Sequence, residues 1–243
     1  MGEAKRRKQT GAPSPVRKKN STTLLVSAAV AVIVVVAVAL YFLAAPPAPT
    51  ADDLPVASPD ADAFPSLLDR YGVSVGAENA PIVVREFADY QCPACARFAE
   101  ASQRLKNEYV ESGKVRFVYF ELPLRQHQNA MPAALAARCA GDQGQYWAMH
   151  DKLYATQGEW SGSGKASAIF SRYARDLGLE ERRFGRCMDT ELHKEAVEQS
   201  LQVAMQLRVA STPTVMVDNI RLTRPGWGQL SAVVERELAR AGH

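Results

Sequence analysis

The chain has 243 residues, enough for one domain of about 180 residues and additional segments. With 47% hydrophobic and 23% charged residues, its composition is that of an ordinary globular protein. The net charge of +3 is unevenly distributed, because residues 1–20 carry a net +6 and leave a net −3 on the remainder. A basic tail of this kind can bind nucleic acid, but an apolar segment follows it, and we expect no nucleic-acid partner.

The apolar segment comprises residues 24–45, in which only a serine and a tyrosine carry polar side-chain atoms. As a helix it would be about 33 Å long, which matches the hydrocarbon core of a bilayer. Since basic residues precede it, we predict a transmembrane anchor with the tail, residues 1–23, in the cytoplasm and the rest exported. The protein would then lie in the cell inner membrane, with its main domain periplasmic or otherwise extracytoplasmic. A cleaved signal peptide is the alternative, but its apolar region is usually about 7–15 residues, and Ala-Pro-Pro at 45–47 is a poor cleavage site.

A proline-rich segment follows the predicted anchor. Residues 46–65 contain six prolines among alanine, aspartate and serine. This composition predicts a semi-rigid, extended linker that buries no core and holds the following domain, residues 66–243, off the membrane. A disordered leader without a spacing role is the alternative.

The domain opens with a strand–helix–strand pattern. The predicted elements are a helical turn at 66–71, an edge strand at 73–75, a strand at 82–87, a helix at about 93–112 and a strand at 115–122. The helix is predicted from small and apolar residues at steps of three and four, and Gly113 ends it. Since both long strands are apolar enough to be buried, they predict a parallel pair joined by a right-handed crossover.

A C-x-x-C motif lies where the first long strand meets the helix. Pro93 suits the first helical position, which places Cys92 at the N-cap, where the helix dipole and free backbone N–H groups stabilise a thiolate. Cys95 lies one turn further in and should be more buried. An exposed, acidified thiol beside a resolving thiol is suited to thiol–disulfide exchange. A zinc site or two core cysteines are the alternatives, but the other two cysteines are isolated and the four histidines lack metal-ligand spacing, so we predict no metal site.

The second half of the domain begins with a helical segment. Residues from about 129 to 208 predict an insert with helices at 131–139, 146–153, 166–177 and 190–207. His150, beside Trp147, is predicted to be a packed helix residue rather than a ligand, and His127 in a preceding loop is assigned no role.

After the insert, a β-branched strand at 214–217 begins directly after Pro213, which is allowed at the first residue of a strand. A turn leads to a short strand at 220–222, and an amphipathic helix at about 230–238 ends the pattern.

Over about residues 73–241, this combination resembles the DsbA-type thiol:disulfide oxidoreductases of the thioredoxin superfamily, in particular their membrane-anchored bacterial members. The markers are the run from Phe87 to Cys95, the Thr212-Pro213 step before a strand, and the helical insert. The resemblance implies an α/β thioredoxin fold with a helical insertion between its βαβ and ββα halves, here preceded by one transmembrane helix. It requires no cofactor.

The resemblance also implies roles for individual residues. Cys92 would be the nucleophile, and Cys95 would resolve the mixed disulfide. Pro213 would be in cis and face the two cysteines; an ordinary trans proline is the alternative. The backbone of Thr212, beside Pro213, would pair with the substrate chain as an added strand. Glu86 would be a buried acid that helps to deprotonate Cys95, with a pKa raised by burial; a surface residue at a strand edge is the alternative.

Two departures from the family bear on the direction of electron flow. Strongly oxidising members have a histidine where this chain has Ala94, and Thr212 resembles isomerase-type relatives as much as oxidases. We therefore predict an oxidase of unfolded or reduced exported proteins, weaker than the strongest members and reoxidised by a membrane redox partner. An isomerase or reductase is the first alternative. A tethered chaperone-like or Cu(I)-binding module is the second, although metal storage needs neither Glu86 nor the Thr212-Pro213 step.

The two remaining cysteines, Cys139 and Cys187, fall in the insert, and many anchored relatives resemble this arrangement. Because disulfides persist in exported domains, we predict a structural disulfide between them. Two buried free thiols are the alternative, since free cysteine also packs well in cores.

Overall fold

The structure is a computed structural model that describes residues 30–36, 54–58 and 63–242. The chain divides into two compact units, residues 1–48 and residues 49–243. In the first unit, residues 30–36 are helical and exposed. The predicted basic tail and most of the predicted anchor lie outside the described residues. Within the described ranges, no helix is both long and apolar enough to cross a membrane.

The second unit is built on a five-stranded mixed sheet with the strand order β1-β3-β2-β4-β5. The strands are β1 (Val73–Val75), β2 (Ile82–Ala88), β3 (Val115–Glu121), β4 (Thr214–Val217) and β5 (Ile220–Arg221). The two central strands, β2 and β3, are parallel, and every other pairing is antiparallel. This confirms the predicted parallel pair and the short edge strand at β1.

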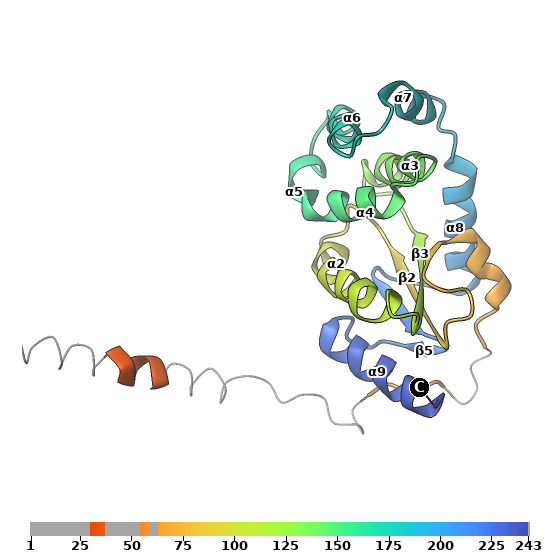
Figure 1. The fold of residues 1–243 in the computed structure, drawn as a ribbon. Coiled ribbons are helices and arrows are strands. Elements are labelled where there is room, and N and C mark those ends of the chain that lie inside the picture. The colour runs from red at the N-terminus through yellow and green to blue at the C-terminus, as the bar shows by residue number, and fades with distance from the viewer. Residues whose placement is uncertain (1–29, 37–53, 59–62, 243) are drawn as a thin grey trace, which may run out of the picture. The chain divides into compact units, whose positions relative to one another are not determined.

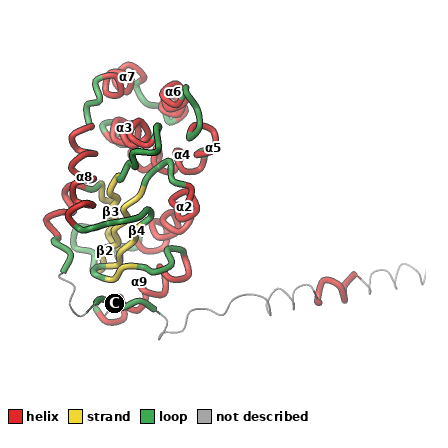
Figure 2. The backbone as a smooth tube through the Cα atoms, turned by 180° about the vertical axis from the view of Figure 1, so that it is seen from behind, coloured by secondary structure: helices red, strands yellow, loops and turns green. Residues whose placement is uncertain are grey.

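Helices cover both faces of the sheet and extend beyond its end. They are η2 (Ser66–Tyr71), α2 (Pro93–Leu105), the π-helical η3 (Lys106–Val110), α3 (Ala130–Gly141), α4 (Tyr146–Ala155), α5 (Gln157–Trp160), α6 (Ala166–Asp176), α7 (Glu181–Asp189), α8 (Lys194–Gln206) and α9 (Trp227–Arg240). Figure 1 shows α2 on one side of the sheet and α8 on the other, and Figure 2 shows the same layers from behind. The helices α3, α4, α6 and α7 gather beyond one end of the strands, as the predicted insert requires.

Side-chain alternation along β2 explains the two layers. Ile82 and Val84 belong to the core that α2 and α9 share, whereas Val83 and Phe87 pack in a second cluster with α8. Because successive side chains of a strand point to opposite faces, the apolar run of β2 is buried on both sides. The first of these layers contains Cys95, so the face of Val84 is also the face beneath the C-x-x-C motif.

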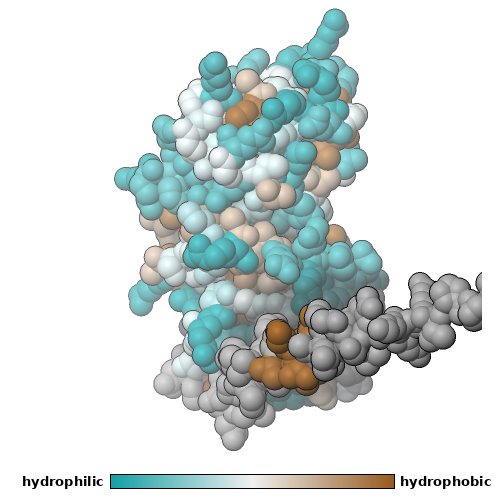
Figure 3. Space-filling view, turned by 90° about the vertical axis from the view of Figure 1, so that its left-hand side faces the viewer, coloured by the Kyte–Doolittle hydropathy of each residue, from teal (hydrophilic) through white to brown (hydrophobic). Residues whose placement is uncertain are grey.

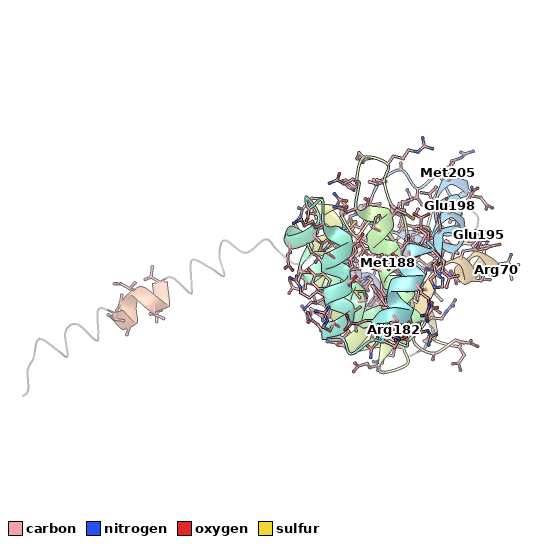
Figure 4. The ribbon with its side chains drawn as sticks, turned by 90° about the horizontal axis from the view of Figure 1, so that it is seen from above. Arg70, Arg182, Met188, Glu195, Glu198 and Met205 are labelled. Atoms are coloured by element: carbon pink, nitrogen blue, oxygen red, sulfur yellow. A yellow bond between two sulfur atoms is a disulfide. The ribbon has the colours of Figure 1, made fainter. Side chains whose placement is uncertain are left out.

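Two helices of the insert, the short α5 and α7, escaped the sequence analysis. The sequence of α7 is mostly polar, and only Phe184 and Cys187 on it are buried. Its start is fixed by Glu180, whose side chain accepts hydrogen bonds from two backbone N–H groups of the first turn. Figure 4, viewed from the α7 end, shows Arg182 and Met188 of this helix over the insert. The helix expected from residue 190 begins only at Lys194, because a turn occupies the residues between.

The predicted linker does not stay apart from the fold. Leu54 and Phe64 are each only 9% exposed, and Leu54 belongs to the main core. The Arg236 side chain on α9 donates a hydrogen bond to the Pro55 carbonyl oxygen at 2.8 Å, and Phe64 lies under the Arg85 guanidinium at 3.9 Å. The expectation that residues 46–65 bury no core is therefore wrong for these two side chains. An extended, proline-rich backbone still presents its apolar residues to a neighbouring surface.

Candidate functional site

The C-x-x-C motif lies at the start of α2, as predicted. Cys92 is the N-cap residue with an extended backbone, and Pro93 is the first helical residue. The backbone N–H of Cys92 donates to the Asp89 carbonyl oxygen at 3.0 Å, which closes the turn between β2 and the helix. The carbonyl oxygen of Cys92 then accepts the first helical hydrogen bond from Ala96. This local geometry follows from the proline and from the tight turn before it.

The two thiols are free and differ sharply in acidity. A hydrogen bond from the Cys95 thiol lowers the pKa of Cys92 to about 4, against an opposing effect of burial. A side-chain hydrogen bond from Thr212 and the backbone N–H groups of Cys95 and Ala94 lower the pKa further. The pKa of Cys95 is raised, first by its hydrogen bond to Cys92 and then by burial. The pair therefore carries one proton, which resides on Cys95.

Two details of the predicted motif need correction. Cys92 is only 8% exposed and Cys95 is fully buried, so the order of burial is right but the predicted exposure of Cys92 is wrong. The free N–H groups of the helix start do favour the thiolate, but the Cys95 thiol has the larger effect on its pKa. The reason is geometric, since both sulfur atoms lie on the same turn of one helix.

The loop before β4 faces the motif. The peptide bond between Thr212 and Pro213 is cis, as predicted. The Cys92 sulfur lies 3.7 Å from the Thr212 carbonyl oxygen, although 120 positions separate the two residues. The antiparallel pairing of β4 with β2 brings them together, because Thr214 is the register partner of Phe87, just before the motif.

Glu86 is buried in the middle of the sheet, as predicted. It is 1% exposed, and its register partners are Tyr119 on β3 and Val215 on β4. Neither carboxyl oxygen has a hydrogen-bond partner. Burial raises the pKa of Glu86 to about 8, although the positive charge of Lys106 partly offsets this. When Glu86 is charged, its field contributes to the raised pKa of Cys95, which places the two groups within electrostatic reach of each other.

Asp89 and His127 are among the polar residues of the site that the sequence analysis missed. The Asp89 carboxylate is buried and accepts hydrogen bonds from the backbone N–H groups of Gln91 and Leu124. It also lies 2.7 Å from Nδ1 of His127, the residue to which the sequence analysis gave no role. The only local signal is Asp89 itself, since an aspartate two residues before a turn N–H commonly accepts its hydrogen bond. Nothing local indicates His127, because the loop that carries it approaches only in the folded state.

The helical insert also supports the motif. The amide of Gln157, on α5, donates hydrogen bonds to the carbonyl oxygens of Tyr90 at 2.7 Å and Cys92 at 3.0 Å. His150, on α4, is fully buried among aromatic rings, which confirms its predicted packing, and burial lowers its pKa. One side of the C-x-x-C motif is therefore held by elements that follow it by more than fifty residues.

The other two cysteines form a disulfide. It joins Cys139 on α3 to Cys187 on α7, with the Cα atoms 5.8 Å apart, which is the predicted pairing. Among the residues that the structure describes, these two cysteines and His193 are close enough together to hold a metal ion. Because the disulfide engages both sulfur atoms, this group is not a metal site in the oxidised protein.

A family model described as thioredoxin matches residues 69–236. The chain belongs to the thioredoxin family. Solved DsbA proteins are among the structures that share its fold. The resemblance that the motifs indicated, and the fold it implied, are thereby confirmed for the described domain.

Relatives of this thioredoxin-family chain carry several names. It is 29% identical over 173 residues to the probable disulfide bond formation protein D of Bacillus anthracis, covering 69% of the chain and 78% of that protein. A solved thioredoxin-like oxidoreductase from Silicibacter pomeroyi is 31% identical with a TM-score of 0.59, over 73% of this chain and 98% of that one. The chain is also 35% identical over 168 residues to the Na(+)/H(+) antiporter NhaA 3 of Salinispora tropica, covering 68% of the chain but only 24% of the antiporter. Since the match spans about a quarter of the antiporter, we infer no transport activity from it.

Proposed function

We propose that the chain is a thiol:disulfide oxidoreductase that acts through Cys92 and Cys95. The observation that carries the proposal is the pair of free thiols at the start of α2, with the Cys92 sulfur 3.7 Å from the Thr212 carbonyl oxygen and Cys95 fully buried beside it. In this setting the pKa of Cys92 is lowered to about 4 and the pKa of Cys95 is raised. A stable thiolate is a good leaving group and a ready nucleophile at neutral pH. The Thr212 backbone, whose carbonyl oxygen lies beside the Cys92 sulfur, gives a substrate chain a place to pair. The buried carboxyl group of Glu86 can accept a proton from Cys95 or return it.

We further propose that the pair oxidises its substrates. A substrate thiolate attacks the Cys92 sulfur, the Cys92–Cys95 bond breaks, and Cys95 leaves as a thiolate that takes a proton from Glu86. A second substrate thiolate attacks the substrate sulfur of the mixed disulfide, which closes the substrate disulfide and releases Cys92 as a thiolate. The substrate loses two electrons and the cysteine pair gains them. Because the Cys92 thiolate is stabilised, the reduced pair is stabilised and its disulfide is the stronger oxidant.

The contacts of Cys92 compensate for the missing histidine. Ala94 offers no side-chain hydrogen bond to the thiolate, but its backbone N–H and the Thr212 side chain both lower the pKa of Cys92. Thr212 is therefore compatible with an oxidase and need not indicate an isomerase. Relatives named disulfide bond formation protein and thioredoxin-like oxidoreductase support the same reaction class.

We propose that the domain is exported and tethered by residues 24–45, with the tail of residues 1–23 in the cytoplasm. Its substrates would then be unfolded or reduced exported proteins, and a membrane redox partner would reoxidise it. A reporter fused after His243 is expected to be active outside the cytoplasm. Cytoplasmic activity of the fusion, or a mature protein that lacks residues 1–45, would contradict the membrane tether. Neither result would contradict the proposed thiol–disulfide exchange at Cys92 and Cys95.

The reduction potential of the Cys92–Cys95 pair tests the function. The full chain is equilibrated with glutathione buffers to obtain this potential. Its ability to oxidise a reduced, unfolded protein is measured in parallel. An oxidase is expected to have a potential well above that of thioredoxin, about −270 mV. A potential near that value, with a Cys92 pKa near 8.5, would favour a reductase or isomerase instead. Retention of Cu(I) after dialysis, without exchange activity, would favour the tethered metal-binding module.

A further inference from the structure

The disulfide of the helical insert lies beside two further groups that can bind a metal ion. Asp142 is the C-cap residue of α3, which carries Cys139, and His193 is the N-cap residue of α8. The ligand atoms of Cys139, Cys187 and His193 all lie within 4.8 Å of one another. One carboxylate oxygen of Asp142 lies 2.9 Å from Nε2 of His193 and 3.7 Å from the Cys187 sulfur. Four potential ligands therefore meet where α3, α7 and α8 come together.

The types and the spacing of these four residues are typical of a structural zinc site. Thiolate, imidazole and carboxylate groups all bind Zn²⁺, most often as four ligands in a tetrahedron. Two residues separate Cys139 from Asp142, and five separate Cys187 from His193. Paired zinc ligands are commonly separated by about 2–5 residues, so both pairs fall within this range.

The distances within the cluster are close to those that zinc requires. With bonds of about 2.0–2.3 Å to the metal, neighbouring ligand atoms of a tetrahedral site lie about 3.3–3.8 Å apart. The separations among His193, Asp142 and the sulfur atoms depart from this range by at most about 1 Å, which side-chain rotation can supply. The two sulfur atoms can move apart once the disulfide is reduced.

A turn between α7 and α8 brings His193 back to Cys187. The backbone N–H of Leu192 donates to the Cys187 carbonyl oxygen at 3.1 Å, which closes the turn. Within it, Glu191 has a φ of +48°, a left-handed conformation that few residues other than glycine adopt. The fold therefore holds the imidazole at the cysteine pair. The sequence analysis predicted no metal site because it treated these two cysteines as isolated.

The cluster is open to solvent on one side. A surface cavity of about 410 Å³ is lined by Asp142 and Cys187, together with other residues of α7 and the turn that follows it. The His193 and Asp142 side chains are 24% and 29% exposed, whereas Cys139 is buried. Hydrophilic residues predominate at the top of the molecule in Figure 3, the end at which α6 and α7 lie in Figure 1. A hydrated ion can therefore reach the ligands from this end.

Two arginines match the charge of a loaded site. Two thiolates and one carboxylate carry one more negative charge than a Zn²⁺ ion neutralises. Arg183 and Arg186 line the same cavity as Cys187, and positive charge beside a thiol favours its thiolate form. The Arg183 guanidinium donates to the Asp142 carbonyl oxygen at 2.7 Å, so its charge is held at the cluster.

We propose that Cys139, Cys187, His193 and Asp142 form a zinc site in the reduced protein, in which the two cysteines are not yet joined. Zn²⁺ displaces one proton from each thiol when it binds. The oxidised protein does not bind zinc there, because the sulfur atoms of a disulfide are not thiolates. The inference does not depend on the reaction proposed for the C-x-x-C motif.

Oxidation exchanges the metal for the disulfide. With oxidised glutathione, one cysteine thiolate attacks a glutathione sulfur, and a glutathione thiolate leaves. The second cysteine thiolate attacks the cysteine sulfur of this mixed disulfide, which forms the Cys139–Cys187 bond and releases the other glutathione thiolate together with Zn²⁺. Two electrons pass from the cysteine pair to glutathione. Either the metal or the disulfide crosslinks α3 to α7, so the insert is held together before and after oxidation.

The test measures Zn²⁺ binding by the full chain with Cys92→Ser and Cys95→Ser, in which Cys139 and Cys187 are the remaining cysteines. The protein is reduced with a phosphine, which adds no competing thiol, and Zn²⁺ is titrated against a chromophoric chelator. We expect one Zn²⁺ per chain with a Kd below about 100 nM, as for structural zinc sites. Co²⁺ in place of Zn²⁺ should give thiolate charge-transfer absorption and the intense visible bands of a four-coordinate ion.

Matched variants assign the ligands. His193→Ala and Asp142→Asn should each weaken Zn²⁺ binding about tenfold or more, since even residues that only support zinc ligands have effects of that size. His127→Ala and Asp189→Asn should bind as tightly as the parent protein. His127 lies beside Asp89 near the C-x-x-C motif, and Asp189 is an exposed residue of α7 outside the cluster.

Two further measurements separate ligation from folding. His193→Asn keeps a favourable N-cap residue for α8 and should weaken binding as much as His193→Ala does. Oxidation of the loaded protein by glutathione disulfide should release one Zn²⁺ for each disulfide formed. Equal affinities in His193→Asn and His127→Ala would overturn the proposed site. Zinc binding by the oxidised protein as tight as by the reduced protein would also overturn it, as would the absence of Zn²⁺ binding by the reduced parent.

Discussion

The two cysteine pairs of this chain lie in one domain but have opposite chemical settings. Cys92 and Cys95 lie on the first turn of a single helix, share one proton and are free thiols. Cys139 and Cys187 come from two different helices and are joined in a disulfide. Burial alone does not distinguish the pairs, since all four residues are buried.

The difference between the pairs is in what surrounds the sulfur atoms. Around Cys92, hydrogen bonds from Cys95 and Thr212 favour the charged sulfur. A disulfide there is a good oxidant because its reduced form is stabilised. The Cys139–Cys187 disulfide instead crosslinks α3 and α7 in the helical insert, where it restricts the unfolded chain. The first pair is therefore expected to react and the second to hold the insert together.

The largest expected effect comes from removing the reactive sulfur. Cys92→Ser should lower the rate of disulfide exchange with a reduced substrate protein by at least about 1000-fold, because a serine hydroxyl stays protonated at neutral pH. Cys95→Ser should still react at Cys92 but accumulate a mixed disulfide, detectable by its mass. If Cys92→Ser keeps substantial exchange activity while the Cys139 and Cys187 pair is intact, the assignment of the two pairs is reversed.

The second pair should matter for stability and not for exchange. Replacing both Cys139 and Cys187 by alanine should lower the free energy of unfolding by about 2–4 kcal/mol, as measured by urea denaturation. The rate of Cys92 alkylation in the same variant should match the wild type. A loss of exchange activity in a folded variant would mean that the two pairs exchange electrons and that the comparison drawn above is too simple.

Glu86→Gln should act on both rate and stability. Resolution of the mixed disulfide by Cys95 should slow by about tenfold or more, while alkylation of Cys92 is unaffected, because only the proton acceptor for Cys95 is removed.

The stability effect of Glu86→Gln should depend on pH. Because burial raises the pKa of Glu86 to about 8, the wild-type fold loses stability as pH rises from about 4.3, the ordinary glutamate value, through about 8. The variant lacks this loss, so its advantage in unfolding free energy should grow over that range to about 1–3 kcal/mol, after the cost of an unpaired buried amide. If the difference in unfolding free energy between the variant and the wild type is the same at pH 4 and at pH 8, the raised pKa of Glu86 is contradicted.

The smallest expected effect concerns the source of Cys92 acidity. The absorbance of the thiolate should titrate near pH 4 in the reduced protein. Because the pKa of Cys92 is lowered, its contribution to the stability of the reduced form is full above the ordinary thiol value of about 8.5 and is lost as pH falls through about 4. Cys95→Ala removes the hydrogen bond with the largest effect and should raise this pKa by about one unit or more, while Thr212→Ala should raise it less. A larger shift in Thr212→Ala would assign the acidity to the loop before β4.

Several features of the protein were determined by neighbours in the sequence. Pro93 after Cys92 was enough to place the cysteine at a helix N-cap, because capping depends on residues within one turn. The long strands and the final helix were also predictable, because their apolar residues repeat with a clear period. The polar α7 shows the limit of that signal, since it buries few side chains and its start depends on the cap at Glu180.

The properties of the site were decided only by the tertiary structure. The sequence indicated that Cys92 is acidic, but the main cause, a hydrogen bond from Cys95, and the contact with Thr212 depend on how the sulfur atoms and a distant loop are oriented. The pairing of Asp89 with His127 was not visible in the sequence at all. Capping and periodicity depend on residues close together in the chain, whereas hydrogen bonds and loss of solvent depend on groups that meet only when β2, β3, β4 and the helical insert have packed together.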